Sequence, residues 1–333
     1  MSDHARFEAG VVGAGAWGTT IASHLANRGH STLLWAFEEE VADEINSNHR
    51  NSVYLHDINL PDGLSATTEL ADMSAAKYLI IMVPSGFYKR TVEDLSKYID
   101  ESIPILSATK GFVSDELARP SEFLAEMCPG HAIGVLSGPN LAREIAHGLP
   151  AISLVASHDE KLVQSFQSLL STERFRVYGG TDMIGTELGG ALKNIMAIAA
   201  GMVDGLNLGK NTHAALITRG LAEMIRLGEE LGARTKTFYG VSGLGDLVCT
   251  AQSTLSRNHQ VGNRIAKGEK LEDIVSASRA VAEGIDTTRH VHAYSVKNGI
   301  DLPITDAVYK VLFKGADPFG ALRDLMTRAL KME

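Results

Sequence analysis

The N-terminal part of the chain changes its hydrophobic period twice. An apolar run that includes residues 11–12 is typical of a buried strand, and Ile21 and Leu25 then lie on one face of a predicted helix. Gly29 ends that helix, and residues 32–35 return to an extended apolar pattern. The pattern therefore predicts a strand, a helix and a second strand in close succession.

Further apolar runs predict that strands and helices continue to alternate, with a helix at residues 91–99. The predicted strands cover residues 77–84, 103–108, 132–136, 151–156 and 175–178, and the last two are expected at the far edge of the sheet. Such an alternation is typical of a doubly wound α/β sheet.

From about Asp182 onward the pattern changes to that of long helices. Residues 214–231 place six apolar side chains near one helical stripe, which is the pattern of a helix packed on a core. These side chains are Leu216, Ile217, Leu221, Met224, Ile225 and Leu231. We therefore predict an α/β domain over residues 1–180 and an all-helical domain over residues 181–333, with the boundary near Gly179 and Gly180.

Composition narrows the class of protein. The chain has 333 residues, of which 44% are hydrophobic, and a formal net charge of −9, so two ordinary domains and no extended nucleic-acid surface are expected. Two widely separated cysteines support neither a disulfide framework nor a zinc site, and no metal site is predicted. Neither a secretory signal nor a membrane span is evident. The chain is expected to be a cytoplasmic enzyme with a small ligand.

A glycine triplet lies between the first strand and the first helix. Gly13, Gly15 and Gly18 have the G-x-G-x-x-G spacing of a dinucleotide-binding turn. Gly13 would form the tight turn, Gly15 would let the backbone approach a pyrophosphate, and Gly18 would let the helix pack on the sheet. Glycine-rich turns also occur without nucleotides, but the flanking strand–helix–strand pattern favours a nucleotide here.

Two lysines lie next to or within apolar segments, where a charged side chain is costly to bury. Lys110, in SATKGF, follows a predicted strand at the carboxyl edge of the sheet and could hold an anion there, or it is an ordinary exposed loop lysine. Lys193, followed by Asn194, interrupts a run of small and apolar residues. If Lys193 is buried, desolvation lowers its pKa and suits it to proton exchange; alternatively it extends from a core helix to solvent.

A third polar segment contains an acidic group and a hydroxyl–guanidinium–amide series. Ser256, Arg257 and Asn258 together suit a phosphate, although Ser256 is also a good helix cap. Asp246 is either a helix cap, a surface carboxylate or the partner of a catalytic lysine.

These segments together resemble those of the bacterial NAD(P)-dependent glycerol-3-phosphate dehydrogenases over nearly the whole chain. The shared segments, in order, are GAGAWGT, YLHDINLP, the Val83-Pro84-Ser85 turn, SATKG, SGPNLA, ELGGALKNIMAIAAGMVDGLNLG, LITRGLAEMIRLGEELGA, GLGDL, SRN and VAEG. The resemblance implies a Rossmann-like N-terminal domain, a helical C-terminal domain and reversible reduction of dihydroxyacetone phosphate to sn-glycerol 3-phosphate, which supplies phospholipid backbones. A homodimer is compatible with it.

The resemblance also implies roles for individual residues. Lys193 would be the general acid or base at the C2 oxygen, with Lys110 and Asp246 beside the reacting carbon. The substrate site would be formed by Lys110, Lys193, Asp246, Gly138, Asn140, Ser256, Arg257 and Asn258. The cofactor site would be formed by Gly13, Gly15, Ala16, Trp17, Gly18, Phe37, Lys110, Ala142, Arg257, Val281 and Glu283.

Three positions depart from the family pattern. Ala16 replaces a frequent serine, and Asn140 replaces the usual serine or threonine, so each lacks a hydroxyl. Phe37 stands where many relatives have a basic residue suited to the extra phosphate of NADP, and residues 38–40 are all glutamate. Charge favours NAD, whereas the family accepts both cofactors and often favours NADPH, so the sequence leaves NAD and NADP open. The glutamates also suit the first turn of a helix.

Two other functions are compatible with parts of the pattern. A β-hydroxyacid dehydrogenase of the hydroxyisobutyrate or 6-phosphogluconate type also pairs such a domain with a Lys-Asn sequence, but GLGDL and SRN favour the glycerol phosphate interpretation. A non-catalytic dinucleotide sensor should have lost Lys193 or Asp246, and both are present.

Overall fold

In the computed structural model, residues 6–277 and 281–329 are described, so the outer ends of both predicted domains lie outside the described residues. Within the described part, eight strands form one sheet in the order β3-β2-β1-β4-β5-β6-β7-β8. The strands are β1 Phe7–Val12, β2 Thr32–Trp35, β3 Leu64–Thr67, β4 Ala76–Ile81, β5 Ile105–Ser107, β6 Ile133–Ser137, β7 Ala151–Ala156 and β8 Phe175–Gly180. Strand β7 runs antiparallel to β6, and the other neighbours are parallel. The predicted doubly wound sheet is confirmed, with β7 and β8 at its far edge.

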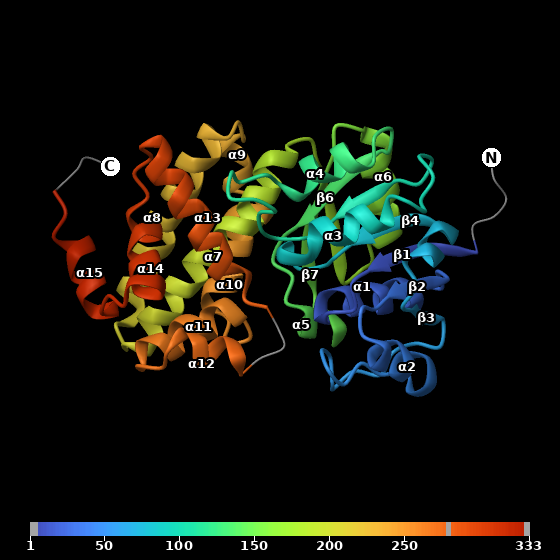
Figure 1. Ribbon diagram of the computed structural model, residues 1–333, viewed down its shortest axis with the longest axis horizontal. Helices are drawn as coiled ribbons and strands as arrows, with labels where there is room; N and C mark the ends of the chain where they lie inside the picture. Colours follow the sequence, from blue (N-terminus) through green and yellow to red (C-terminus); the bar gives the residue numbers. More distant parts are fainter. Residues whose placement is uncertain (1–5, 278–280, 330–333) are drawn as a thin grey trace.

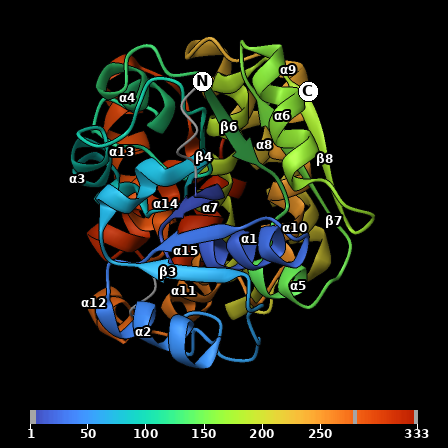
Figure 2. The same ribbon diagram turned by 90° about the vertical axis from the view of Figure 1, so that its right-hand side faces the viewer.

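Helices cover both faces of this sheet. They are α1 Ala16–Asn27, α2 Glu39–Asn48, α3 Ser85–Leu95, α4 Pro120–Met127, α5 Ala142–Ala146 and α6 Glu160–Leu170, with a 3₁₀ turn at Leu70–Ala75. Val11 and Ile80 belong to the core under α1, α2 and α6, whereas the next residues, Val12 and Ile81, belong to the core under α3 and α4. Figure 2 shows α3 and α4 on one side of the strands and α6 on the other. Burial on both faces explains the continuous apolar runs.

The second half of the chain is helical (Figure 1). Its helices are α7 Met183–Gly205, α8 Gly209–Glu230, α9 Thr235–Phe238, α10 Asp246–Gln252, α11 Arg257–Ala266, α12 Leu271–Ser276, α13 Glu283–Asn298, α14 Pro303–Lys314 and α15 Pro318–Met326, and a π-helical turn spans Val241–Gly245. Helix α7 is buried from Gly185 to Val203 and packs against α8, α10, α11 and α13. The predicted stripe of α8 packs on this helical core.

Two sequence predictions place element boundaries wrongly. The strand predicted at residues 77–84 ends at Ile81, and the helix predicted at 91–99 is α3, which begins at Ser85 and ends at Leu95. Pro84 explains why residue 84 is not part of the strand, because proline cannot donate to a strand ladder and here it directly precedes α3, with φ of −58°. The other predicted strands agree with the structure to within two residues, whereas β3 was not predicted.

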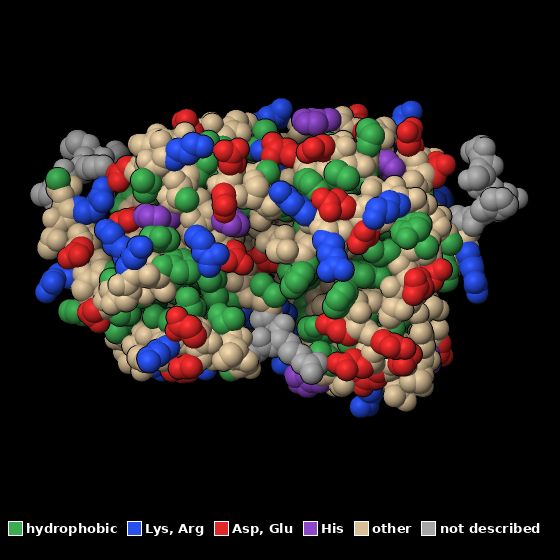
Figure 3. All heavy atoms as spheres, in the orientation of Figure 1, with side chains coloured by type: hydrophobic (Ala, Val, Ile, Leu, Met, Phe, Trp, Pro, Cys, Tyr) green, Lys and Arg blue, Asp and Glu red, His purple; other side chains and the backbone are tan. Residues whose placement is uncertain are grey.

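In the described part of the chain, no helix is both long enough and apolar enough to cross a membrane. On the face shown in Figure 3, acidic and basic side chains are interspersed. The last strand ends at Gly180 and α7 begins at Met183, whereas the domain boundary near residue 180 stays a prediction.

Candidate active site

The glycine triplet forms a tight strand-to-helix turn. Gly13 has φ of +117°, a conformation that L side chains rarely adopt. A Cβ on Gly18 would lie 1.8 Å from the Gly13 carbonyl oxygen, so only glycine allows α1 to approach this closely. A Cβ on Gly15 would meet no atom within 4 Å, because Gly15 faces open space at the N-terminus of α1. A helix N-terminus with open space in front of it fits a pyrophosphate.

The other N-terminal residues predicted to bind the cofactor lie around this turn. Ala16 and Trp17 begin α1, and the buried Nε1 of Trp17 has no hydrogen-bond partner among the described residues. The carbonyl of Ala142 accepts a hydrogen bond from Thr20 Oγ1 at 3.2 Å, which places the start of α5 beside α1. Ala142, although distant in sequence, therefore lies beside the helix that follows the glycine turn.

The end of β2 presents one apolar and one acidic side chain. Phe37 is 73% exposed and contacts Trp35 edge-on, with ring centroids 6.4 Å apart. The Tyr54 hydroxyl donates to Glu38 Oε1 at 2.6 Å. Glu39 and Glu40 form the first turn of α2, so the helix-start interpretation holds for these two glutamates.

Lys193 is buried on α7 and bound by two residues of α10. Its Nζ lies 2.5 Å from Asp246 Oδ1 and donates to Thr250 Oγ1 at 2.6 Å. Burial lowers the pKa of Lys193 to about 8, while the Asp246 carboxylate acts in the opposite direction. Only 7% of the residue is exposed, so Lys193 does not extend to solvent. Its ammonium group can therefore exchange a proton close to neutral pH.

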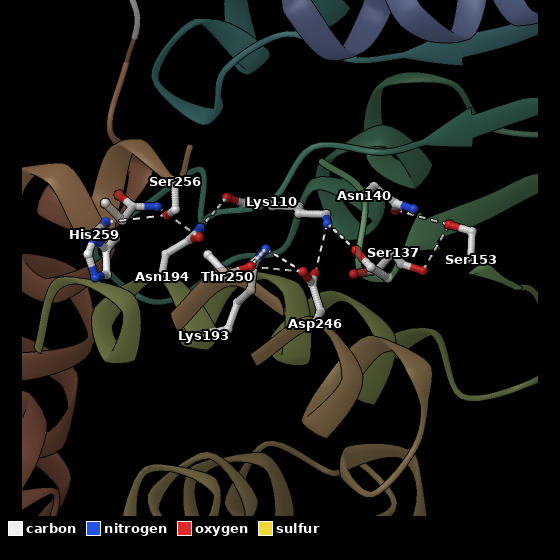
Figure 4. A network of polar contacts seen from close by, with 12 residues as sticks. Lys110, Ser137, Asn140, Ser153, Lys193, Asn194, Asp246, Thr250, Ser256 and His259 are labelled. Carbon is white, nitrogen blue, oxygen red and sulfur yellow. Dashed lines mark hydrogen bonds and ion pairs between the residues drawn. The ribbon is translucent and has the colours of Figure 1, made fainter. Parts of the chain in front are cut away.

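The second lysine approaches the same carboxylate from the sheet. Lys110 follows β5, and its Nζ lies 2.8 Å from Asp246 Oδ2 and 2.8 Å from the Gly138 carbonyl oxygen. Figure 4 shows Lys110, Lys193 and Asp246 pointing toward one another. The exposed-loop interpretation of Lys110 is wrong, because its side chain is only 17% exposed. One buried carboxylate thus joins lysines of both halves of the chain.

A π-helical turn delivers Asp246 to this position. A Cβ on Gly243 would lie 2.1 Å from the Phe238 carbonyl oxygen, and a Cβ on Gly189 would lie 2.3 Å from that of Ser242. Gly243 therefore lets the turn pack on the end of α9, and Gly189 lets it pack directly on α7. Asp246 begins α10 where the turn ends.

Gly138 and Asn140 lie where β6 turns toward β7. Gly138 has φ of +150°, and a Cβ there would meet the Ser153 Cα at 3.0 Å. The Asn140 amide donates to the Ile152 carbonyl at 3.2 Å, and its Oδ1 accepts from Ser153 Oγ at 3.0 Å. Where the family pattern has a serine or threonine hydroxyl, Asn140 therefore has an amide, and that amide is hydrogen-bonded to two residues of β7.

The SRN residues begin α11. Ser256 Oγ caps the helix by accepting the His259 N–H at 3.3 Å, so its predicted capping role is confirmed. Arg257 is exposed, and its Nη1 donates to the Val281 carbonyl at 3.2 Å. Asn258 is buried and donates to Asn194 Oδ1 at 2.9 Å. This last bond places the SRN segment beside the residue that follows Lys193.

Glu283 joins the helical domain to the start of α3 in the N-terminal domain. Its carboxylate accepts the main-chain N–H of Ser85 at 2.8 Å and also the Ser85 hydroxyl. Burial raises the pKa of Glu283, and the two bonds from Ser85 oppose that shift. Asn258 Oδ1 accepts the N–H of the next residue, Gly284, at 2.9 Å. The start of α13 is thus bound both to the start of α3 and to α11.

Comparison with known proteins identifies the family of the chain. Residues 8–163 match the model of the N-terminus of NAD-dependent glycerol-3-phosphate dehydrogenase, and residues 182–323 match the model of its C-terminus. The chain belongs to this dehydrogenase family. The family resemblance seen in the sequence is therefore confirmed.

Individual relatives align with this chain over nearly its whole length and nearly the whole of their own. The NAD(P)+ glycerol-3-phosphate dehydrogenase of Maridesulfovibrio salexigens is 46% identical and covers 97% of this chain and 99% of its own. That of Syntrophotalea carbinolica is 43% identical over 97% of this chain and 98% of its own. The crystal structure of glycerol-3-phosphate dehydrogenase from Coxiella burnetii is 36% identical, with a TM-score of 0.93 over 96% of this chain and 98% of that one. The Rossmann-like domain followed by a helical domain is thus confirmed.

Three further residues bind members of this candidate site and have no role predicted from the sequence. Thr250 binds Lys193, Asn194 binds Asn258, and Ser85 binds Glu283. Thr250 had a detectable signal, because Asp246 and Thr250 are four residues apart and therefore share one helix face. Ser85 had no such signal, since its partner is 198 positions away.

Proposed function

We propose that this chain is an NAD(P)-dependent sn-glycerol-3-phosphate dehydrogenase that reduces dihydroxyacetone phosphate at C2, reversibly, and supplies backbones for phospholipid synthesis. Family membership supports the activity. The observation that carries the proposal at the site is the Asp246 carboxylate between Lys193 and Lys110. A buried lysine with a pKa of about 8 is suited to acid–base catalysis at a carbonyl oxygen.

The glycine turn and its surroundings fit a dinucleotide, as the open space at Gly15 indicates. The cofactor would lie against Gly13, Gly15, Ala16, Trp17, Gly18, Phe37, Lys110, Ala142, Arg257, Val281 and Glu283. When bound, the nicotinamide supplies the hydride. Phe37 and Glu38 would face the adenosine end, where an acidic residue after the second strand binds ribose hydroxyls.

Lys193 would protonate the C2 oxygen as that oxygen gains negative charge, and in the reverse direction it would accept the hydroxyl proton. Lys110 would add positive charge beside the same oxygen. Asp246 would hold both ammonium groups in place, since its two oxygens each bind one lysine. Thr250 accepts a hydrogen bond from Lys193 and would fix its direction.

The substrate would lie between the lysines and the start of α11. Gly138 and Asn140 would line one side, while Ser256, Arg257 and Asn258 would bind the phosphate. The N-terminus of a helix together with a guanidinium group is a favourable phosphate site. Asn258 is already oriented by Asn194, so its position is linked to the helix that carries Lys193.

The division at residue 180, a cytoplasmic location and a homodimeric state are part of the proposal. The two-cysteine composition supports a reducing compartment. Size-exclusion chromatography with light scattering tests the homodimer.

The deciding experiment is oxidation of NADH, and separately NADPH, by purified protein with dihydroxyacetone phosphate. Rapid loss of reduced-nicotinamide absorbance would support the dehydrogenase. No oxidation with either cofactor would overturn it and direct attention to hydroxy acids. Cofactor binding without turnover of any substrate would favour the sensor.

A further inference from the structure

Asp204, near the C-terminal end of α7, binds histidines from two other helices. Its Oδ1 accepts from His213 Nε2 of α8 at 2.7 Å, and its Oδ2 accepts from His259 Nε2 of α11 at 2.8 Å. Both histidines are buried. Burial acts to raise the pKa of Asp204, but the bonds from His259 and His213 outweigh it and leave the pKa lowered. An ionised carboxylate therefore ties α7, α8 and α11 together.

Glycines bring the backbones of α7 and α11 into direct contact beside this carboxylate. A Cβ on Gly201 would lie 1.9 Å from the His259 carbonyl oxygen, and a Cβ on Gly262 would lie 1.9 Å from that of Ile198. The two helices are therefore packed too closely for any side chain between them at these points. Small displacements of α11 along α7 would be transmitted directly to its N-terminal turn.

His259 lies in that N-terminal turn. Its main-chain N–H donates to the capping oxygen of Ser256, and its ring is bound by Asp204. Arg257 and Asn258 lie in the sequence between the capping Ser256 and His259. Asn258 is bonded to Asn194, the residue that follows Lys193 on α7. The geometry of the phosphate site relative to the proton donor thus depends on where the His259 ring is bound.

We propose that Asp204 is a positioning residue for recognition of the substrate phosphate, an inference that rests on the proposed function. Through His259 it fixes the first turn of α11, and so holds Arg257 and Asn258 at the distance from Lys193 that a phosphorylated three-carbon substrate requires. Asp204 itself would touch neither substrate nor cofactor. His213 stabilises the same carboxylate from α8.

Steady-state kinetics of Asp204→Asn and His259→Phe test this role with dihydroxyacetone phosphate and with unphosphorylated dihydroxyacetone. Loss of a hydrogen bond to a charged group predicts that KM for dihydroxyacetone phosphate rises about tenfold. We expect kcat with that substrate, and kcat/KM for dihydroxyacetone, to change by less than about twofold, because only phosphate binding is affected. The double variant should be no worse than the poorer single variant, since Asp204→Asn weakens and His259→Phe removes the same bond.

Three further variants separate positioning from general loss of structure. His259→Gln keeps an amide donor for Asp204 and should restore most of the phosphate-dependent affinity. His213→Phe keeps the bond to His259 and should raise KM less than His259→Phe does. Asp324→Asn, on α15, is the matched control that should behave as the wild type. Circular dichroism and thermal unfolding identify variants that do not fold; if Asp204→Asn is one, the histidine variants decide.

The two proposals fail in different ways. Absence of dihydroxyacetone phosphate reduction by the wild type would overturn the proposed function and, with it, this inference. An active wild type with unchanged KM in the folded variants would overturn only the positioning role. The same conclusion would follow if both substrates lost activity equally, or if His259→Gln were no better than His259→Phe.

Discussion

The Nζ of Lys193 lies 2.5 Å from Oδ1 of Asp246, and both residues are buried. The second oxygen of the same carboxylate binds Lys110, which belongs to the sheet domain. Two ammonium groups therefore share one counter-charge at the junction of the domains. Their total charge exceeds that of Asp246, which suits the site to an anionic substrate and to negative charge that develops on its oxygen.

Lys193→Ala should remove most turnover while leaving cofactor affinity near that of the wild type. General acid–base groups contribute roughly 100- to 10,000-fold to a rate, so kcat should fall within that range. Stopped-flow absorbance measures the hydride step, and NADH fluorescence titration measures cofactor binding. A variant that keeps wild-type kcat would remove Lys193 from its proposed role.

The pH dependence of reduction should follow Lys193. The donor must be protonated for reduction, and burial lowers its pKa to about 8, so kcat/KM should be constant well below pH 8 and fall as the pH rises through it. The oxidation direction needs the neutral amine and should show the opposite trend. Asp246→Asn removes a carboxylate that raises the pKa of Lys193. The decline of kcat/KM with rising pH should therefore begin at a lower pH in this variant than in the wild type. A shift to higher pH would contradict this assignment.

The local sequence was sufficient to predict the parts of the site that lie on one element. The spacing of Gly13, Gly15 and Gly18 predicted the turn, and the cost of burying a lysine among apolar residues indicated Lys193. The pairing of Lys193 with Asp246 was also expected once the carboxylate was assigned to the same site, and the structure confirms that pairing.

Contacts that depend on how distant elements pack could not be predicted in the same way. Glu283 and Ser85 approach only because the start of α13 lies beside the start of α3. The bonds from Asp204 to His213 and His259 likewise depend on the packing of three helices. Neither contact leaves a periodic signal, because hydrophobic spacing reports which face of an element is buried and not which element covers it.

The two glycines of the nucleotide turn should have separable effects. Gly15→Ala has room for its Cβ and a compatible φ of −65°, so the protein should fold with an unchanged Tm, but the methyl group would occupy the space proposed for the pyrophosphate. We expect NADH affinity to fall at least about tenfold. Gly18→Ala would clash with the Gly13 carbonyl and should lower Tm as well. Thermal unfolding and NADH titration of both variants distinguish these effects; equal losses of Tm would argue against the proposed use of Gly15.

Arg257→Ala should weaken binding of the phosphorylated substrate more than that of dihydroxyacetone. A hydrogen bond to a charged group contributes about 1.5–3 kcal/mol, so KM for dihydroxyacetone phosphate should rise roughly 10- to 100-fold. Arg289→Ala is a suitable control, because Arg289 is also exposed but pairs with Asp286 on α13. Equal losses with both substrates would exclude phosphate recognition by Arg257.

The residues after β2 predict that NADH is used more efficiently than NADPH. Phe37 supplies no cation for a 2′-phosphate, and Glu38, held by Tyr54, would repel that phosphate while accepting ribose hydroxyls. Phe37→Arg adds the missing cation at a side chain that is already 73% exposed, so it should fold normally. A new charged contact should raise the NADPH/NADH ratio of kcat/KM by roughly tenfold or more. Phe37→Leu removes the ring without adding charge and should leave the ratio near that of the wild type; if the leucine variant changes it as much as the arginine variant, ring size and not charge governs cofactor choice.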